Sequence, residues 1–194
     1  MTPYATLRAA ALPRGFWFPG LSAWDLFVYG IRSSAPPASD RFDDRIGVAY
    51  VDGRGAPQVE EWPATTDPGA AALAHASNPD GCATLIPGQY RRCWTTGEHH
   101  PGTPGAYPCL VPSPDWRAFP VWRGTDRVTI HRDGLAIQLH HAGAASVRVG
   151  SWSEGCQVLQ RAQDLSRLLE LVRAQDQAGL GHLVSYALFG PGQI

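Results

Sequence analysis

The sequence contains no lysine, because all 16 of its cationic residues are arginine. A Schiff-base lysine, the lysine of a P-loop and the lysine of a protein kinase are therefore excluded. The chain also has little net charge, since 17 Asp and Glu nearly balance the arginines and leave −1. This balance argues against a protein that holds nucleic acid by bulk electrostatic attraction.

Three further absences narrow the class of protein. No stretch approaches 18 uncharged apolar residues, so we expect no membrane span. Residues 1–20 lack a basic segment followed by an apolar one, so no signal peptide is visible and we expect a protein that is cytoplasmic as synthesised. Cysteines are too few for a disulfide scaffold, and they form no CxxC pair to support a structural zinc site: Cys82, Cys93, Cys109 and Cys156.

The composition is typical of a compact domain with many turns. Of the 194 residues, 44% are hydrophobic, which is enough for a packed core, while 21 Gly and 17 Pro indicate few long helices. We interpret residues 1–45 as an N-terminal extension packed on the core, with a short helix over Leu21–Ile31 and a linker over Ser33–Ser39. Residues 46–194 form the main domain, for which we predict a mostly β (α+β) fold.

The main domain consists of short β-like runs and one long helix. The helix is predicted over Gln163–Ala178, because its leucines repeat at helical spacing and Gly179 provides a stop. Alternation near the end of one strand places His140 and His141 on opposite faces, so only one of them is expected to face a given site. The predicted strands are Ile46–Val51, Gln58–Trp62, Cys82–Ile86, Val121–Trp122, Val128–His131, Leu135–His141, Ser146–Trp152 and Leu183–Phe189.

The stretch Leu139–Val158 carries the strongest chemical signal. Cys156 follows His140 by sixteen positions, a spacing that a hairpin can close to bring an imidazole beside a thiol. Gly155 permits a sharp turn before the cysteine, and the N–H groups of Gly155 and Cys156 would then face a developing oxyanion. These are the parts of an acyl-transfer site, with Cys156 as nucleophile and His140, or alternatively His141, assisting proton transfer.

Ser153-x-Gly155-Cys156, preceded by a histidine at a strand end, resembles the active-site motif of the L,D-transpeptidase catalytic domain, the YkuD-like family. The resemblance extends to a phage and bacterial subgroup and covers residues 60–175. Its matching segments, in chain order, are ATTDPG (64–69), LIPGQY (85–90), W-x-x-G-x-H (94–99) and WSEGCQV (152–158).

The resemblance implies a YkuD-like β-sandwich with one long helix after the catalytic cysteine. It implies L,D-carboxypeptidase or L,D-transpeptidase activity on peptidoglycan stem peptides through a Cys156 acyl-enzyme, with no metal or other cofactor. His140 takes the position of the catalytic histidine, and Ser153 and Gly155 take those of the small residues of the motif. The residues expected to bind substrate are His141, His99, Tyr90 and Gln157.

The sequence departs from the family pattern at three positions. His141 stands where many members have glycine, and Gln157 stands where many have an arginine credited with holding a substrate carboxylate or ordering the loop. Glu154 replaces a histidine or small residue, and its carboxylate is expected to raise the pKa of the Cys156 thiol unless it points away.

Other interpretations of the same residues, with purely structural roles, stay open. Cys156 can be a small buried hydrophobe, Tyr90 a core tyrosine, and His99 and His100 solvated residues of a loop, TTGEHHPG. For the whole protein, a zinc hydrolase using His99, His140 or His141 with Cys156 or a carboxylate is one alternative. A non-catalytic cell-wall-binding module of the same fold is the other.

The expected substrate conflicts with the expected compartment, because peptidoglycan lies outside the cytoplasm. Either another system delivers the protein to the periplasm or cell wall, as happens with phage lysis proteins and injected effectors, or the substrate is a cytoplasmic peptide such as a recycled wall fragment. The sequence does not decide between them.

Overall fold

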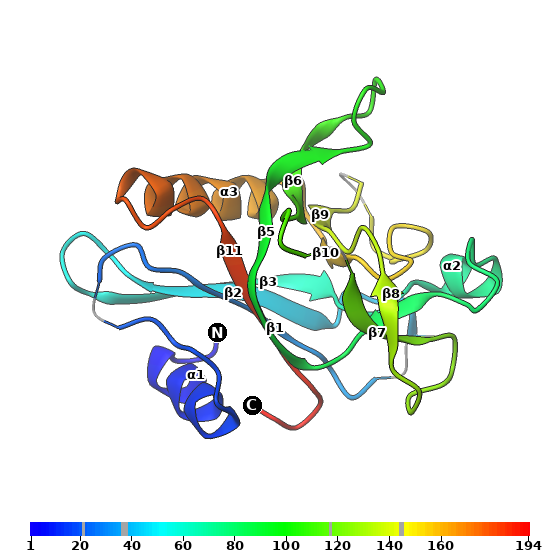
Figure 1. Ribbon diagram of the computed structural model, residues 1–194, viewed down its shortest axis with the longest axis horizontal. Helices are drawn as coiled ribbons and strands as arrows, with labels where there is room; N and C mark the ends of the chain where they lie inside the picture. Colours follow the sequence, from blue (N-terminus) through cyan, green and yellow to red (C-terminus); the bar gives the residue numbers. More distant parts are fainter. Residues whose placement is uncertain (21, 36–38, 117, 144–145) are drawn as a thin grey trace.

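Most strands of the protein close into one barrel. The computed structural model describes residues 1–20, 22–35, 39–116, 118–143 and 146–194. Eight strands make up the barrel, and neighbours in the order β1-β11-β5-β6-β9-β10-β3-β2 are hydrogen-bonded (Figure 1). Their bounds are β1 Phe27–Ile31, β2 Asp44–Val51, β3 Pro57–Thr65, β5 Gly88–His99, β6 Tyr107–Pro112, β9 Leu139–His141, β10 Gln157–Leu159 and β11 Val184–Phe189.

A second, smaller sheet lies beside the barrel in the order β4-β7-β8. Its strands are β4 Ala83–Leu85, β7 Phe119–Arg123 and β8 His131–Gly134. With 35% strand and 18% helix, the predicted mostly β class is confirmed. The resemblance implied a β-sandwich, whereas the described strands form a closed eight-stranded sheet and a three-stranded one.

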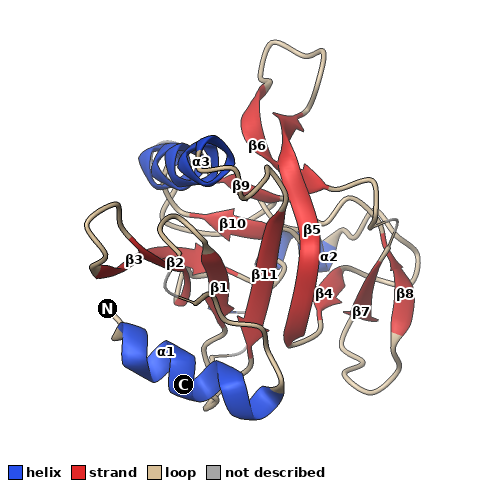
Figure 2. Cartoon of the chain, turned by 60° about the vertical axis from the view of Figure 1, so that its left-hand side comes forward, coloured by secondary structure: helices blue, strands red, loops and turns tan. Residues whose placement is uncertain are grey.

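Two helices cover opposite sides of the barrel, as both ribbon views show (Figures 1 and 2). The helix α3, Ala162–Gln177, buries an apolar stripe that includes Leu165, Leu168 and Leu171 in the main core. The helix α1, Tyr4–Ala11, packs Leu7 and Ala11 into a separate cluster on the other side. Two short helices complete the described secondary structure: α2 Ala70–Ala74 and the 3₁₀ helix η1 Leu12–Arg14.

The strand β1 corrects the helix predicted over Leu21–Ile31, of which residue 21 lies outside the described residues. All five residues of β1 are buried: Val28 belongs to the main core, while Phe27 and Tyr29 belong to the α1 cluster. A strand buried on both faces is a continuous apolar run, so its spacing does not distinguish it from a helix. The division at residue 45 stays a prediction, although the barrel includes β1 from the expected extension.

Several strands were predicted well, and others were placed wrongly. The predictions for β2, β3, β4, β7, β11 and α3 are confirmed to within a few residues. No strand forms over the described part of 146–152, which is made of turns, and β10 follows only after Cys156. The runs 128–131 and 135–141 are strand only at His131 and at Leu139–His141. The segment around His99 is the end of the long strand β5 rather than a loop.

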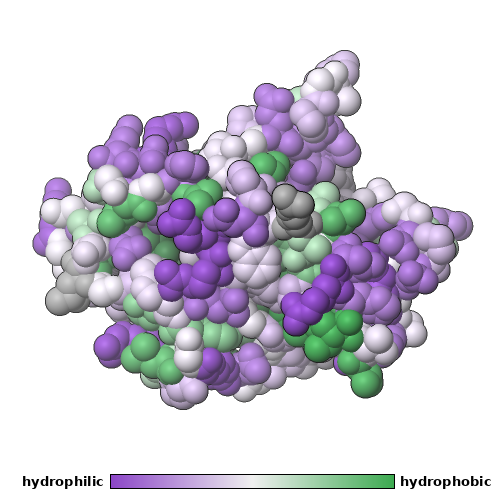
Figure 3. Space-filling view, viewed as in Figure 1, coloured by the Kyte–Doolittle hydropathy of each residue, from purple (hydrophilic) through white to green (hydrophobic). Residues whose placement is uncertain are grey.

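The surface carries one visible apolar feature near the small sheet. Figure 3 shows hydrophobic residues over the far end of the β7–β8 hairpin, within a mixed and mostly hydrophilic face. The connection between these strands exposes Val128 by 86% and Ile130 by 57%. Leu135, at the other end of β8, is 70% exposed and lines the same cavity as Cys156.

Candidate active site

Cys156 lies in a tight turn that Ser153 organises. The Ser153 hydroxyl accepts a hydrogen bond from the Gly155 N–H at 3.1 Å and donates one to the Cys156 carbonyl at 2.9 Å. Gly155 has φ 141°, and a Cβ at this position would lie 2.8 Å from the Ala83 carbonyl oxygen. The turn therefore requires both a small hydroxyl residue and a glycine, in agreement with the motif. The predicted oxyanion role of the Gly155 N–H is corrected, because Ser153 occupies that donor.

The pairing of β9 with β10 sets the relation between Cys156 and His140. The two strands are parallel, with Val158 opposite His140 and the Gln157 N–H donating to the Gln138 carbonyl at 2.8 Å. Side chains two positions apart share a face, so Cys156 and His140 lie on the same face, one diagonal step apart.

His140 is buried, with 1% of its surface exposed, and its contacts select one tautomer. Its Nδ1 lies 3.0 Å from the His141 carbonyl oxygen, which can only accept, so Nδ1 carries the proton. The Tyr107 hydroxyl donates to that same carbonyl at 2.9 Å and lies 3.2 Å from Nδ1. Nε2 is thus left as the nitrogen that can accept a proton.

A second imidazole packs against the first. The His99 and His140 rings stack with centroids 4.2 Å apart and planes at 17°. His99 Nδ1 lies 2.7 Å from the side-chain oxygen of Gln138, the residue whose backbone also holds β10. The His141 ring stacks on Tyr107, with centroids 4.0 Å apart. The structure thus groups His99, His140 and His141 around one tyrosine.

Electrostatics keep both proposed catalytic groups neutral at rest. Burial and the neighbouring histidines lower the pKa of His140 to about 3. Burial and the charge of Glu154 raise the pKa of the Cys156 thiol to about 11, although the Gln138 N–H opposes the shift. The direction of the Glu154 effect on the thiol pKa is the one that the sequence predicts. The Cys156 thiol donates to the Ala136 carbonyl at 3.6 Å, and no hydrogen bond joins it to His140 in the described residues.

A cavity of about 250 Å³ opens at Cys156. The polar side chains of Ser77 and Arg123 border it, and so do those of Asp133 and Glu154. The Arg123 guanidinium joins two parts of the cavity lining, because it binds both the Asp133 carboxylate at 3.1 Å and the Gly81 carbonyl at 3.1 Å. The small sheet therefore supplies one wall of the space in which a substrate would meet the thiol.

None of the four predicted substrate-binding residues lines this cavity, and neither does His140. Two of the four, Gln157 and Tyr90, are core residues. Gln157 is fully buried, and its side chain bonds the Tyr186 hydroxyl at 2.9 Å and the Gly155 carbonyl. Tyr90 is 3% exposed, bonds the Ile86 carbonyl and packs on aromatic neighbours. Gln157 and Tyr90 act as core residues, because the polar groups of both side chains form hydrogen bonds inside the protein.

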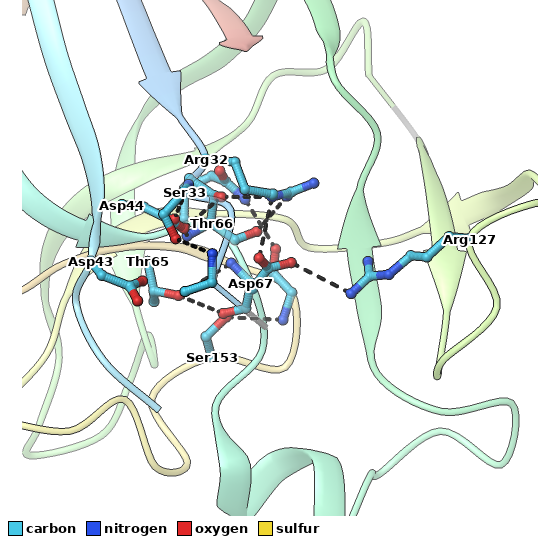
Figure 4. A network of polar contacts seen from close by, with 12 residues as sticks. Arg32, Ser33, Asp43, Asp44, Thr65, Thr66, Asp67, Arg127 and Ser153 are labelled. Atoms are coloured by element: carbon cyan, nitrogen blue, oxygen red, sulfur yellow. Dashed lines mark hydrogen bonds and ion pairs between the residues drawn. The ribbon is translucent and has the colours of Figure 1, made fainter. Parts of the chain in front are cut away.

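The segment ATTDPG supports the cysteine turn from behind (Figure 4). The Asp44 carboxylate accepts the N–H and hydroxyl of Thr66 at 2.6 and 2.7 Å, and Arg32 binds the Thr66 carbonyl at 2.7 Å. Arg32 also pairs with Asp67 at 3.3 Å, so the segment is held by buried charges. Two residues later, the Gly69 N–H donates to the Ser153 carbonyl at 3.0 Å.

Sequence reasoning missed Tyr107, Gln138 and Arg123 as residues of this region. Tyr107 and Cys109 lie two positions apart and share one face of β6. This alternation predicts a strand, but it does not predict which strand pairs with it. Only the pairing of β6 with β9, at Leu110 and Leu139, brings the tyrosine to His140.

Comparison of the chain with protein-family models, curated proteins and solved structures gives no significant match. Within the described ranges, no three His, Cys, Asp or Glu side chains are grouped so as to hold a metal ion. No helix in the described part of the chain is long and apolar enough to cross a membrane.

Proposed function

We propose that the protein is a cysteine-dependent acyl-transfer enzyme of the L,D-transpeptidase, YkuD-like type, acting on peptidoglycan stem peptides. The observation that carries the proposal is the parallel pairing of β9 and β10, from which His140 and Cys156 share one face of the sheet, with Cys156 lining a cavity. The resemblance of the Ser153-x-Gly155-Cys156 segment supports the same assignment.

In the proposed reaction His140 acts as a neutral general base. Nε2 takes the thiol proton as the Cys156 sulfur attacks a peptide carbonyl carbon, and the Cys156 N–H stabilises the oxyanion. The imidazolium then gives its proton to the leaving amine, which departs as the thioester forms. Water or a second amine attacks the thioester, loses its proton to His140, and returns the thiol.

No hydrogen bond joins the thiol to His140 in the described residues, and this agrees with a resting enzyme. Catalytic hydrogen bonds in proteins without substrate are often long and tighten only in the substrate complex. The reaction requires the Cys156 thiol to leave the Ala136 carbonyl, to which it donates in this structure.

The test is mass spectrometry of defined tetrapeptide and pentapeptide muropeptides incubated with the wild type and with Cys156→Ala. We expect loss or exchange of a terminal D-amino acid with the wild type alone. Release to water would identify a carboxypeptidase, and exchange for an added amine would identify a transpeptidase. Equal products from both proteins would overturn the proposal.

The second candidate is a non-catalytic wall-binding module of the same fold. The missing hydrogen bond between Cys156 and His140 is the observation that favours it. Its mark would be binding of the wall polymer by both the wild type and Cys156→Ala, without any change in the muropeptides.

A further inference from the structure

The charges around the Cys156 cavity do not cancel. Arg123, Asp133 and Glu154 are the charged side chains that border it. Arg123 and Asp133 neutralise one another, since the guanidinium Nε lies 3.2 and 3.4 Å from the two carboxylate oxygens and Nη2 lies 3.1 Å from one of them. The arginine also donates to the Gly81 carbonyl. Its charge is therefore neutralised by Asp133, and its orientation is fixed by both partners.

Glu154 has no such compensation. Its carboxylate accepts a hydrogen bond from the Ser77 hydroxyl, and no ion pair to it forms among the residues that the structure describes. Its backbone is fixed, because its carbonyl accepts the Ala83 N–H at 3.0 Å. The charge reaches across the cavity, since it raises the pKa of both the Cys156 and Cys82 thiols.

We propose that this cavity selects ligands that carry a primary ammonium group, which the Glu154 carboxylate receives beside Cys156. The charge preference belongs to the cavity itself, while the nature of the ligand rests on the proposed function: either the acyl donor or the amine acceptor supplies the ammonium. A cation bound at Glu154 also cancels the charge that opposes thiolate formation, so binding activates the nucleophile.

The preference is measured with three methanethiosulfonate reagents of different charge: aminoethyl (cationic), methyl (neutral) and sulfonatoethyl (anionic). The Cys156 thiolate attacks the thiol sulfur of each reagent, forms a mixed disulfide and releases methanesulfinate. Peptide mass mapping assigns the label, because Cys82 also borders the cavity. Rates are divided by those of free 2-mercaptoethanol, a thiol with no other charged group, which removes the intrinsic reactivity of each reagent.

We expect the wild type to favour the cationic over the anionic reagent by about tenfold at low salt, and high salt to reduce this ratio. Glu154→Gln should bring the ratio to that of 2-mercaptoethanol and raise the rate of labelling by the neutral reagent. The matched control is Glu170→Gln on α3, which removes one charge outside the cavity and should keep the wild-type ratio. Asp133→Asn should free Arg123 and shift the ratio toward the anion. A wild-type ratio equal to that of 2-mercaptoethanol, or one unchanged in Glu154→Gln, would overturn the proposal.

Labelling needs no turnover, so this result is independent of whether stem peptides are cleaved. With an active enzyme, acetylation of the donor's side-chain amine should lower kcat/KM in the wild type but not in Glu154→Gln if the donor supplies the ammonium. If the acceptor supplies it, Glu154→Gln should instead raise the amine concentration needed for exchange. If neither change is observed, the assignment of the ligand is overturned.

Discussion

At the scale of single residues, the site combines a thiol and an imidazole that are both neutral. Burial raises the pKa of Cys156 to about 11 and lowers that of His140 to about 3. A preformed thiolate–imidazolium pair would require the opposite shifts. The chemistry must therefore begin with a proton transfer inside the substrate complex, which makes the orientation of His140 decisive.

The titration of the thiol is directly measurable. Since only the thiolate reacts, the rate of Cys156 alkylation by iodoacetamide should rise about tenfold per pH unit between pH 7 and 9. Quenched samples analysed by peptide mass mapping give the rate at each pH. A rate that has already levelled off at pH 7 would mean a thiolate at rest and would contradict this account.

The Tyr107 hydroxyl is expected to act as a positioning group for His140. Tyr107→Phe keeps the ring that stacks on His141 but loses the hydrogen bond to the His141 carbonyl. We expect kcat to fall about tenfold, because general-base catalysis depends on the orientation of the imidazole. Unfolding in urea should show a loss of only about 1 kcal/mol. A kcat that stays at the wild-type value would exclude the positioning role.

At the scale of elements, the cysteine turn depends on a glycine that no other residue replaces. Gly155→Ala would place a Cβ 2.8 Å from a backbone oxygen at a positive φ. We expect it to cost about 1–3 kcal/mol of stability and to abolish turnover. The control is Gly179→Ala, also at a positive φ but with open space around it and outside the cavity. Differential scanning fluorimetry and the muropeptide assay compare the two variants, and equal losses of turnover would refute a local role of the turn.

The elements that the sequence predicted best are those whose pattern is local. The helix α3 repeats its leucines at helical spacing, and Ser153, Gly155 and Cys156 fold a turn by contacts within four residues. The strand β1 was predicted wrongly because both of its faces are buried. Tyr107 was missed because its partner His140 lies 33 positions away, and no local pattern records such a pairing.

At the scale of the whole molecule, the barrel buries a histidine that the unfolded chain would protonate. The unfolded chain binds a proton near pH 6.5, whereas the folded protein resists it down to about 3. Stability therefore rises with pH wherever the unfolded state holds more protons, and this contribution is lost as the pH falls below about 6.5.

We expect His140→Asn to flatten the dependence of stability on pH. Between pH 6 and 4, the wild type should lose up to about 1.4 kcal/mol per pH unit more than the variant. The control is His75→Asn, because His75 is exposed. Urea unfolding at each pH gives the comparison, and parallel curves for wild type and His140→Asn would show that His140 titrates normally.

The central claim is that Cys156 carries the acyl group, and the intact mass of the protein tests it most directly. The wild type is mixed with a defined tetrapeptide, quenched in acid within milliseconds to seconds, and weighed by mass spectrometry. We predict a transient mass increase equal to the peptide minus its leaving amino acid, mapped to Cys156 and absent in Cys156→Ala. Turnover of the tetrapeptide by Cys156→Ala at the wild-type rate would contradict the account.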